Sequence, residues 1–109
     1  MAYDEALADR VRELIAGAPD LAERKMFGGL AFMVRGNMAC GPVGEILMVR
    51  VGPEEYTAAL KRPNAREMTL TGRPMKGFVE LPIDALESDD VLADWIDMGV
   101  DYALSLPPK

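Results

Sequence analysis

The chain has 109 residues, enough for one domain and too few for two ordinary ones. Half of the residues are apolar and 28% are charged, which is the balance of a folded globular protein. One cysteine and no histidine exclude an intrachain disulfide and remove most zinc ligands and the usual Cys-His and Ser-His catalytic pairs. The net charge of −6 disfavours non-specific nucleic-acid binding.

The sequence carries no targeting or membrane-spanning signal. Its N-terminus, Met-Ala-Tyr-Asp-Glu, lacks the basic start and apolar run of a signal peptide. The longest apolar stretch, residues 30–34, ends at Arg35 and is too short to cross a bilayer. A lone thiol suits a reducing compartment. We therefore expect a cytoplasmic protein without membrane contact.

The first predicted element is an amphipathic helix over residues 3–16. Leu7, Val11, Leu14 and Ile15 recur at helical spacing and are expected on its inner side. A glycine and a proline soon after the helix stop it.

Three strands are predicted next. Residues 30–35 alternate with both faces apolar, and Gly36-Asn37 is a two-residue turn signal. Residues 38–41 form a short second strand, residues 41–44 a second turn, and residues 45–51 a third strand. This order predicts an antiparallel meander.

The glycine pair Gly28-Gly29 precedes the first of these strands. We favour a kinked or bulged strand, because paired glycines inside strands often mark a bend, and a hairpin turn is the alternative. The spacing around the pair fits neither a Walker motif nor a dinucleotide-binding fingerprint. A structural role is therefore favoured over a ligand-binding one.

The second half predicts a helix, two strands and a final helix. The first helix begins at residues 52–55 and ends at Pro63-Asn64. Short strands are expected over residues 66–70 and 77–81, and the last helix spans residues 89–104. The order α-β-β-β-α-β-β-α favours one α+β domain over residues 1–109, with a two-layer antiparallel five-stranded sheet and helices on one face.

Several cations are candidates for a binding site. Arg73 and Lys76 share one predicted loop, Arg50 ends a strand, and Lys25 and Arg66 are expected near the same end of the sheet. Convergent Arg and Lys side chains hold carboxylates and phosphates, whereas ordinary surface cations pair with neighbouring acids. The candidate binding residues are Lys25, Phe27, Gly28, Gly29, Arg50, Arg73 and Lys76.

Residue types that often carry chemistry have structural explanations here. The eight methionines are assigned mostly to the core, although Met also forms adaptable surfaces. Cys40 is expected to be a buried thiol, since no neighbouring cation would lower its pKa. The acid pairs Glu54-Glu55 and Asp89-Asp90 begin helices, where they suit the helix dipole. We therefore expect no enzyme, no cofactor and no metal site.

Five blocks of the sequence, in this order, resemble the TfoX N-terminal domain family. They are Arg24–Met33, Gly36–Cys40, Leu47–Arg50, Val51–Tyr56 and Gly72–Gly77. The resemblance covers nearly the whole chain and implies the α-β₃-α-β₂-α two-layer fold. The founding members, TfoX or Sxy, are regulators of natural competence that act with a cyclic-AMP receptor protein in transcription. They resemble this chain only in their N-terminal half, so a stand-alone N-terminal domain is expected.

The resemblance and the missing catalytic residue types favour a non-enzymatic interaction or regulatory module that binds a protein partner. The transcription machinery is one candidate partner, and a second copy of the chain is another. An exposed strand edge or a Met-rich patch would provide the surface. The alternative is an anionic small molecule held by Arg50, Arg73 and Lys76. Direct DNA contact comes third, because the net charge opposes it.

Overall fold

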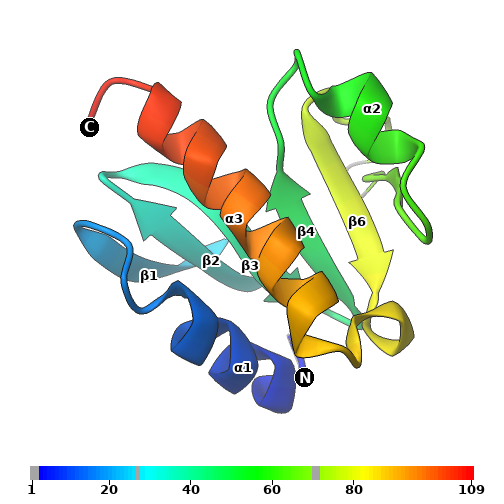
Figure 1. Cartoon of the computed structure of the whole chain (residues 1–109), viewed down its shortest axis with the longest axis horizontal. Helices are drawn as coiled ribbons and strands as arrows, with labels where there is room; N and C mark the ends of the chain where they lie inside the picture. The colour runs from blue at the N-terminus through cyan, green and yellow to red at the C-terminus, as the bar shows by residue number, and fades with distance from the viewer. Residues whose placement is uncertain (1–2, 27, 70–71) are drawn as a thin grey trace.

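A curved antiparallel sheet carries two long helices on one face (Figure 1). The computed structural model describes residues 3–26, 28–69 and 72–109, and within them six strands form one sheet in the order β1-β2-β3-β4-β6-β5. The strands are β1 (Leu21–Met26), β2 (Gly29–Val34), β3 (Asn37–Val43), β4 (Ile46–Arg50), β5 (Arg66–Glu67) and β6 (Phe78–Pro82). The helices are α1 (Glu5–Ile15), α2 (Tyr56–Leu60), the 3-10 helix η1 (Ile83–Leu86) and α3 (Asp89–Ser105).

The predicted α+β class and antiparallel sheet are confirmed, but the predicted number of five strands is wrong. The additional strand is β1, which lies at the edge of the sheet and pairs only with β2 among the described strands. Its inner four residues, Ala22–Lys25, are exposed. An edge strand of this kind lacks the apolar alternation by which strands are recognised, so periodicity does not reveal it.

The glycine pair belongs to a hairpin, so the favoured bulge is wrong and the alternative is confirmed. Met26 of β1 pairs with Gly29 of β2, so the chain reverses direction between them. Gly28 has φ +74°, a left-handed conformation that glycine adopts without steric cost. Phe27, a candidate binding residue, lies outside the described residues.

The next two turns lie close to their predicted places. Val34 pairs with Asn37, so the first turn consists of Arg35 and Gly36, one residue earlier than predicted. Both have positive φ, 53° and 81°, as a tight two-residue hairpin of the primed type requires.

The second turn, predicted over residues 41–44, follows Val43, which pairs with Ile46. Gly41 therefore lies inside β3. A Cβ atom there would overlap the backbone carbonyl oxygen of Leu30, because β2 and β3 approach closely at this point. The glycine in this strand thus serves packing and not a turn.

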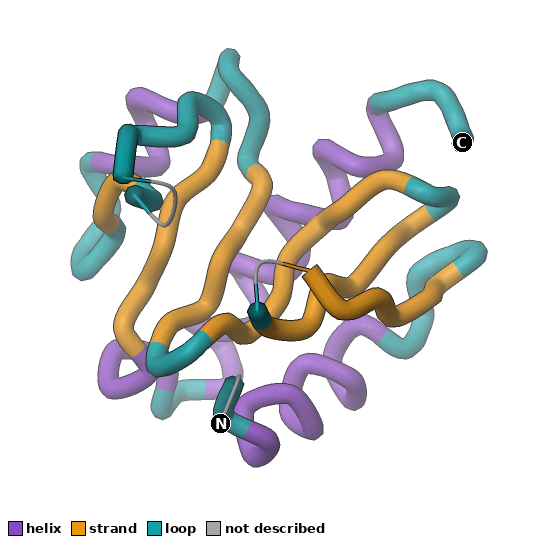
Figure 2. The backbone as a smooth tube through the Cα atoms, turned by 180° about the vertical axis from the view of Figure 1, so that it is seen from behind, coloured by secondary structure: helices purple, strands orange, loops and turns teal. Residues whose placement is uncertain are grey.

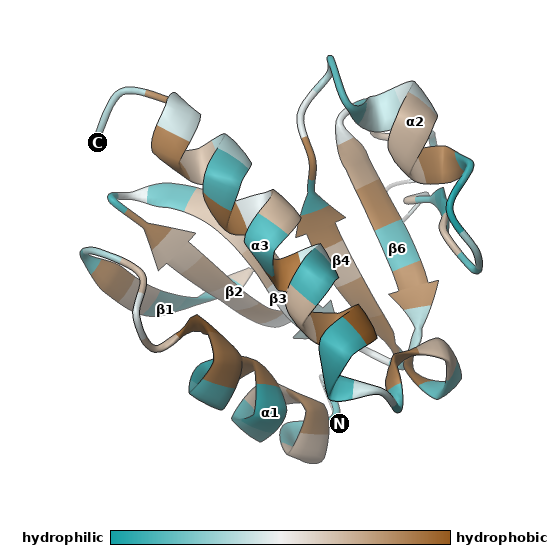
Figure 3. Ribbon diagram, viewed as in Figure 1, coloured by the Kyte–Doolittle hydropathy of each residue, from teal (hydrophilic) through white to brown (hydrophobic). Residues whose placement is uncertain are grey.

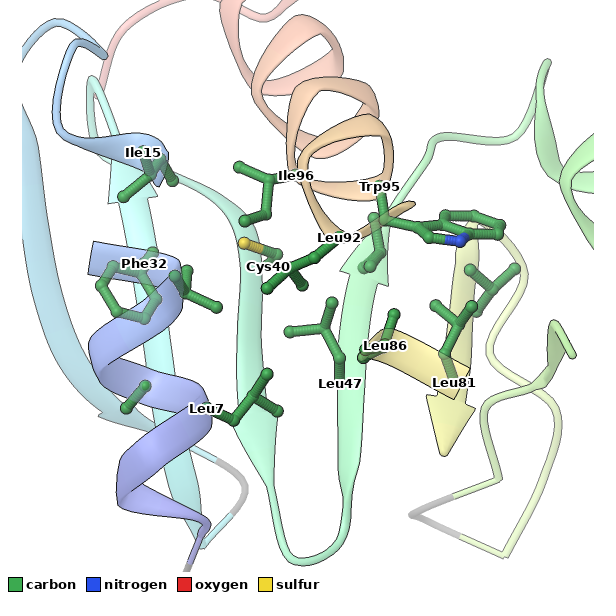
Figure 4. Close-up of a cluster of buried hydrophobic side chains, with 14 of the residues drawn as sticks. Leu7, Ile15, Phe32, Cys40, Leu47, Leu81, Leu86, Leu92, Trp95 and Ile96 are labelled. Carbon is green, nitrogen blue, oxygen red and sulfur yellow. The ribbon is translucent and has the colours of Figure 1, made fainter. Parts of the chain in front are cut away.

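Alternate strand residues face the helices and form the main core. Figure 4 shows Phe32 behind α1 and Cys40 near Ile96 and Leu92 of α3, all in one buried cluster. The Cys40 side chain is fully buried, as predicted, and burial raises the pKa of its thiol to about 12. The thiol is therefore a small apolar group of the core.

The other strand residues form a second apolar cluster on the opposite face, where Figure 2 shows the strands in front of the helices. Its buried members are Ala31, Met33, Met38, Val43, Met48 and Met68. Four of the described methionines are thus buried, in line with the predicted core role. The cluster is a second core, so these methionines offer no exposed Met-rich patch for a partner.

The close approach of β2 and β3 leads to a stability prediction. Replacement Gly41→Ala should lower the free energy of unfolding by about 3 kcal/mol, because backbone atoms of β2 must shift. Gly17→Ala is the control, since a Cβ there meets no atom within 4 Å, and it should change stability by less than about 1 kcal/mol. Urea unfolding followed by Trp95 fluorescence measures both. Equal midpoints for the two variants would contradict the observed packing.

Candidate functional site

The strand registers place the candidate cations at opposite ends of the sheet. Gly29 lies against Val43, next to the start of β4 at Ile46, and Lys25 is in the same hairpin. Arg50 is at the far end of β4. The expected grouping of Lys25 with Arg50 at one end of the sheet is therefore wrong, and so the glycine hairpin and the cationic loop are separate features.

Arg50 is held between two aromatic rings. Its guanidinium carbon lies 5.7 Å from the ring centre of Phe78 on β6 and 5.3 Å from that of Tyr102 on α3. The Arg50 side chain therefore joins the end of the sheet to the final helix through cation–π contacts. This packing gives a structural reason for a cation at this position.

Arg73 and Lys76 lie in the loop before β6, at the same end of the sheet as Arg50. The loop is anchored by Gly77, whose carbonyl oxygen accepts hydrogen bonds from the backbone N–H groups of Val51 at 2.8 Å and Gly52 at 3.0 Å. Both cationic side chains are exposed, and neither forms an ion pair within the described ranges. They are thus available to an anion from solvent.

The outer side of α3 is uniformly acidic. Asp90, Asp94, Asp97 and Asp101 follow one another at helical spacing, and all four are exposed. Figure 3 shows the corresponding hydrophilic bands along this helix. No Lys or Arg occurs within α3. We call these four residues the acidic stripe.

Almost nothing in the fold neutralises the acidic stripe. Among the described residues, only Asp94 has a cationic neighbour, Arg62, at a long 3.9 Å. Like charges four residues apart on a helix destabilise it by about 0.2–0.5 kcal/mol per pair. Asp101 also lies near the C-terminal end of α3, where the helix dipole disfavours negative charge. Asp90, in the first turn of α3, suits the helix dipole, whereas Asp94, Asp97 and Asp101 add like-charge repulsion that no cation within the helix offsets.

An apolar groove of about 290 Å³ runs beside the stripe, between the end of α1 and the second half of α3. It is lined by Leu14, Ile15, Gly17, Ala18, Pro19, Ile96, Asp97, Val100 and Leu104. Leu14 was predicted on the inner side of its helix, yet 38% of it is exposed. Asp97 belongs both to the groove and to the acidic stripe, so the two features form one surface.

Two ion pairs hold α1 in place beside this groove. Arg12 donates from Nε and Nη2 to the two carboxylate oxygens of Glu23 on β1, at 2.7 and 2.9 Å. The Arg12 hydrogen bonds hold the pKa of the Glu23 carboxyl below its usual value. Arg10 donates to the Asp89 carboxylate, at the start of α3, at 3.0 Å. The helix is thereby tied to the sheet on one side and to α3 on the other.

The other cavities are weaker candidates for a binding site than the groove. One cavity, of about 490 Å³, is lined by Asp4, Glu45, Ile46, Arg66, Pro82, Ile83 and Asp84. Although it contains three carboxylates, no group of three or more potential ligands in the described part of the chain could hold a metal ion. A smaller cleft of about 370 Å³ lies between residues 51–55 and Tyr102.

Comparison with known families identifies the domain. The model of the TfoX N-terminal domain family matches residues 13–103, from the second half of α1 to the last turn of α3. The chain belongs to the TfoX N-terminal domain family. No curated protein matches the chain. In this TfoX-family domain, none of the described helices is long and apolar enough to cross a membrane.

The spacing of the aspartates was the signal available in the sequence for the α1–α3 surface. Asp90, Asp94, Asp97 and Asp101 are visible as one helical stripe once the last helix is predicted. The groove itself had no such signal. It depends on how the end of α1 meets α3, about 80 residues later in the chain.

The Arg12–Glu23 pair gives a testable pH dependence. Because the folded state lowers the pKa of Glu23, the pair stabilises the TfoX-family domain at neutral pH, and this contribution is lost as the pH falls below about 4. Glu23→Gln should therefore lower the urea midpoint slightly at pH 7 and not at pH 3. Glu13→Gln, which removes an exposed acid of α1, should show no such pH-dependent difference. A midpoint difference for Glu23→Gln that is equal at both pH values would contradict the ion pair.

Proposed function

We propose that this TfoX-family domain is a non-enzymatic interaction module that binds a protein partner, in a regulatory role, through the surface formed by α1 and α3. The observation that carries the proposal is the apolar groove with exposed Leu14 at its edge. Helical grooves of this kind take apolar side chains from a partner. The absence of histidine and the buried Cys40 favour binding over catalysis.

The position of α1 supports binding without rearrangement. Leu7, Val11 and Ile15 bury α1 against the core before a partner arrives, and the exposed ion pairs of Arg10 and Arg12 add to this packing. A preformed surface loses less conformational entropy on association than one that must be ordered first. The strand edge expected to bind a partner is less suitable, since β1 exposes Glu23, Arg24 and Lys25.

Affinity capture from a native lysate with a matched pair of variants tests this proposal. Leu14→Gln removes an apolar side chain from the groove, and Val91→Gln removes one of similar exposure, 40% against 38%, from another part of α3. A partner captured by the wild type and by Val91→Gln should be reduced about tenfold or more with Leu14→Gln. Equal recovery with both variants, while both keep the wild-type melting temperature, would refute binding through this groove.

The cationic loop supports a second candidate function, the binding of an anionic small molecule. Arg73 and Lys76 are exposed without ion pairs in the described parts of the chain, at the same end of the sheet as Arg50. Their side chains have the chemistry to hold a carboxylate or phosphate. Arg50 would contribute from between its two aromatic neighbours.

A thermal-shift titration with inorganic phosphate, nucleotides and small dicarboxylic acids tests the second candidate. A ligand at about 100 times its dissociation constant stabilises by about 2.7 kcal/mol, which raises the melting temperature by roughly 10 °C. The double variant Arg73→Gln/Lys76→Gln should abolish the shift, and Arg24→Gln/Lys61→Gln should keep it. No shift at millimolar ligand, or an equal loss in both double variants, would exclude this site.

A further inference from the structure

The acidic stripe identifies the chemistry of the partner that the groove would take. On the α1 side, the cations Arg10 and Arg12 are already paired with Asp89, Asp9 and Glu23. On the α3 side, the acids are almost unpaired within the described residues. Arg35 and Lys109 are exposed cations near the Pro19 end of the groove. Along the α3 wall, Asp97 makes the field negative, and a cationic partner is favoured there over an anionic one.

The shape of the groove indicates a helix. Its α3 wall runs from Ile96 to Leu104, which is about 12 Å or two helical turns. Asp97 is the charged residue of its lining, and the other lining residues are apolar or glycine. A partner helix lying along this wall would place apolar side chains at i, i+3, i+4 and i+7 into the groove. Its flanking lysines or arginines would then lie beside Asp97 and reach over the outer side of α3 toward Asp101.

We infer that the α1–α3 surface binds a cationic amphipathic helix of a partner protein, with apolar anchors in the groove and basic side chains along the acidic stripe. This inference rests on the proposed function and adds the chemistry of the partner. It also gives a binding role to Asp97 and Asp101, for which no ion pair is seen among the described residues. A nucleic acid or an anionic membrane would be repelled by the same charges.

A designed peptide pair tests the inference without knowledge of the natural partner. The probe is a helical peptide of about 15 residues with leucines at i, i+3, i+4 and i+7 and lysines elsewhere, and its twin has glutamates in place of the lysines. Binding to the full chain is measured by fluorescence anisotropy and mapped by backbone amide NMR shifts. The lysine peptide should bind, with weaker affinity at higher salt and with shifts at Leu14, Ala18, Val100 and Leu104. The glutamate peptide should not bind.

Variants that neutralise two acids test whether the lysine peptide binds at the acidic stripe or is attracted only by the net charge of the domain. The double variant Asp97→Asn/Asp101→Asn should weaken binding of the lysine peptide by about 2- to 30-fold and make this binding less dependent on salt. Glu54→Gln/Glu67→Gln changes the net charge equally at exposed acids elsewhere and should leave the affinity unchanged. Loss of affinity only in the Asp97 and Asp101 variant supports the inference. Equal loss in both variants, shifts on another surface, or no shifts at millimolar peptide would overturn it.

The remaining outcomes distinguish this inference from the proposed function. One outcome is that capture of the natural partner is lost with Leu14→Gln but retained with Asp97→Asn/Asp101→Asn. In that case the groove binds a protein, and the inference that its partner is a cationic helix is wrong. If capture does not depend on Leu14, the proposed surface itself is wrong. If sedimentation shows a dimer of the chain that Leu14→Gln dissociates, the occupant is a second copy, which also overturns the cationic helix.

Discussion

The packing of α3 across β3 and β4 is the constraint on which the rest of the structure depends. It requires Gly99, because a Cβ at this position would overlap the carbonyl oxygen of Ala39 on β3. With that close approach, Trp95 and Ile96 are buried against the sheet. The same helix then presents its aspartates to solvent, provides one wall of the groove and brings Tyr102 to Arg50. A change in the distance between α3 and the sheet would therefore alter the exposed aspartates, the groove and the Arg50–Tyr102 contact together.

Both faces of the sheet are apolar, and this explains why strand patterning predicted the fold well and the surfaces poorly. In β2, Phe32 contributes to the helix-side core, while Ala31 and Met33 contribute to the second core. Such strands give a strong apolar signal, and the central strands were predicted for this reason. The methionines are part of the same apolar pattern. They could therefore be assigned to a core, but the pattern did not tell which face of the sheet they lie on.

The misplaced elements share a physical cause, which is that strand pairing is decided by contacts distant in sequence. The favoured bulge at Gly28-Gly29 was wrong because Leu21–Met26 pairs with β2. The exposed, charged sequence of Leu21–Met26 contains no pattern that predicts a strand. Arg50 and Lys25 fall at opposite ends of the sheet because of the antiparallel register, which local spacing does not specify. Leu14 matches the apolar spacing of its helix, yet it lines the open groove between α1 and α3 and stays 38% exposed, while Ile15 beside it is buried.

The acidic stripe is explained better by binding than by folding. Removal of Asp97 or Asp101 should favour the helix, since each contributes repulsion along α3 and Asp101 opposes the dipole. Residues that lower stability and persist without partners in the fold are commonly explained by function, because functional sites are where local rules are broken. The charges of α1 point the same way, because Arg10 and Arg12 are paired with Asp89 and Glu23 and do not neutralise the stripe. The uneven distribution of charge, more than the net value of −6, is what distinguishes this face of the domain.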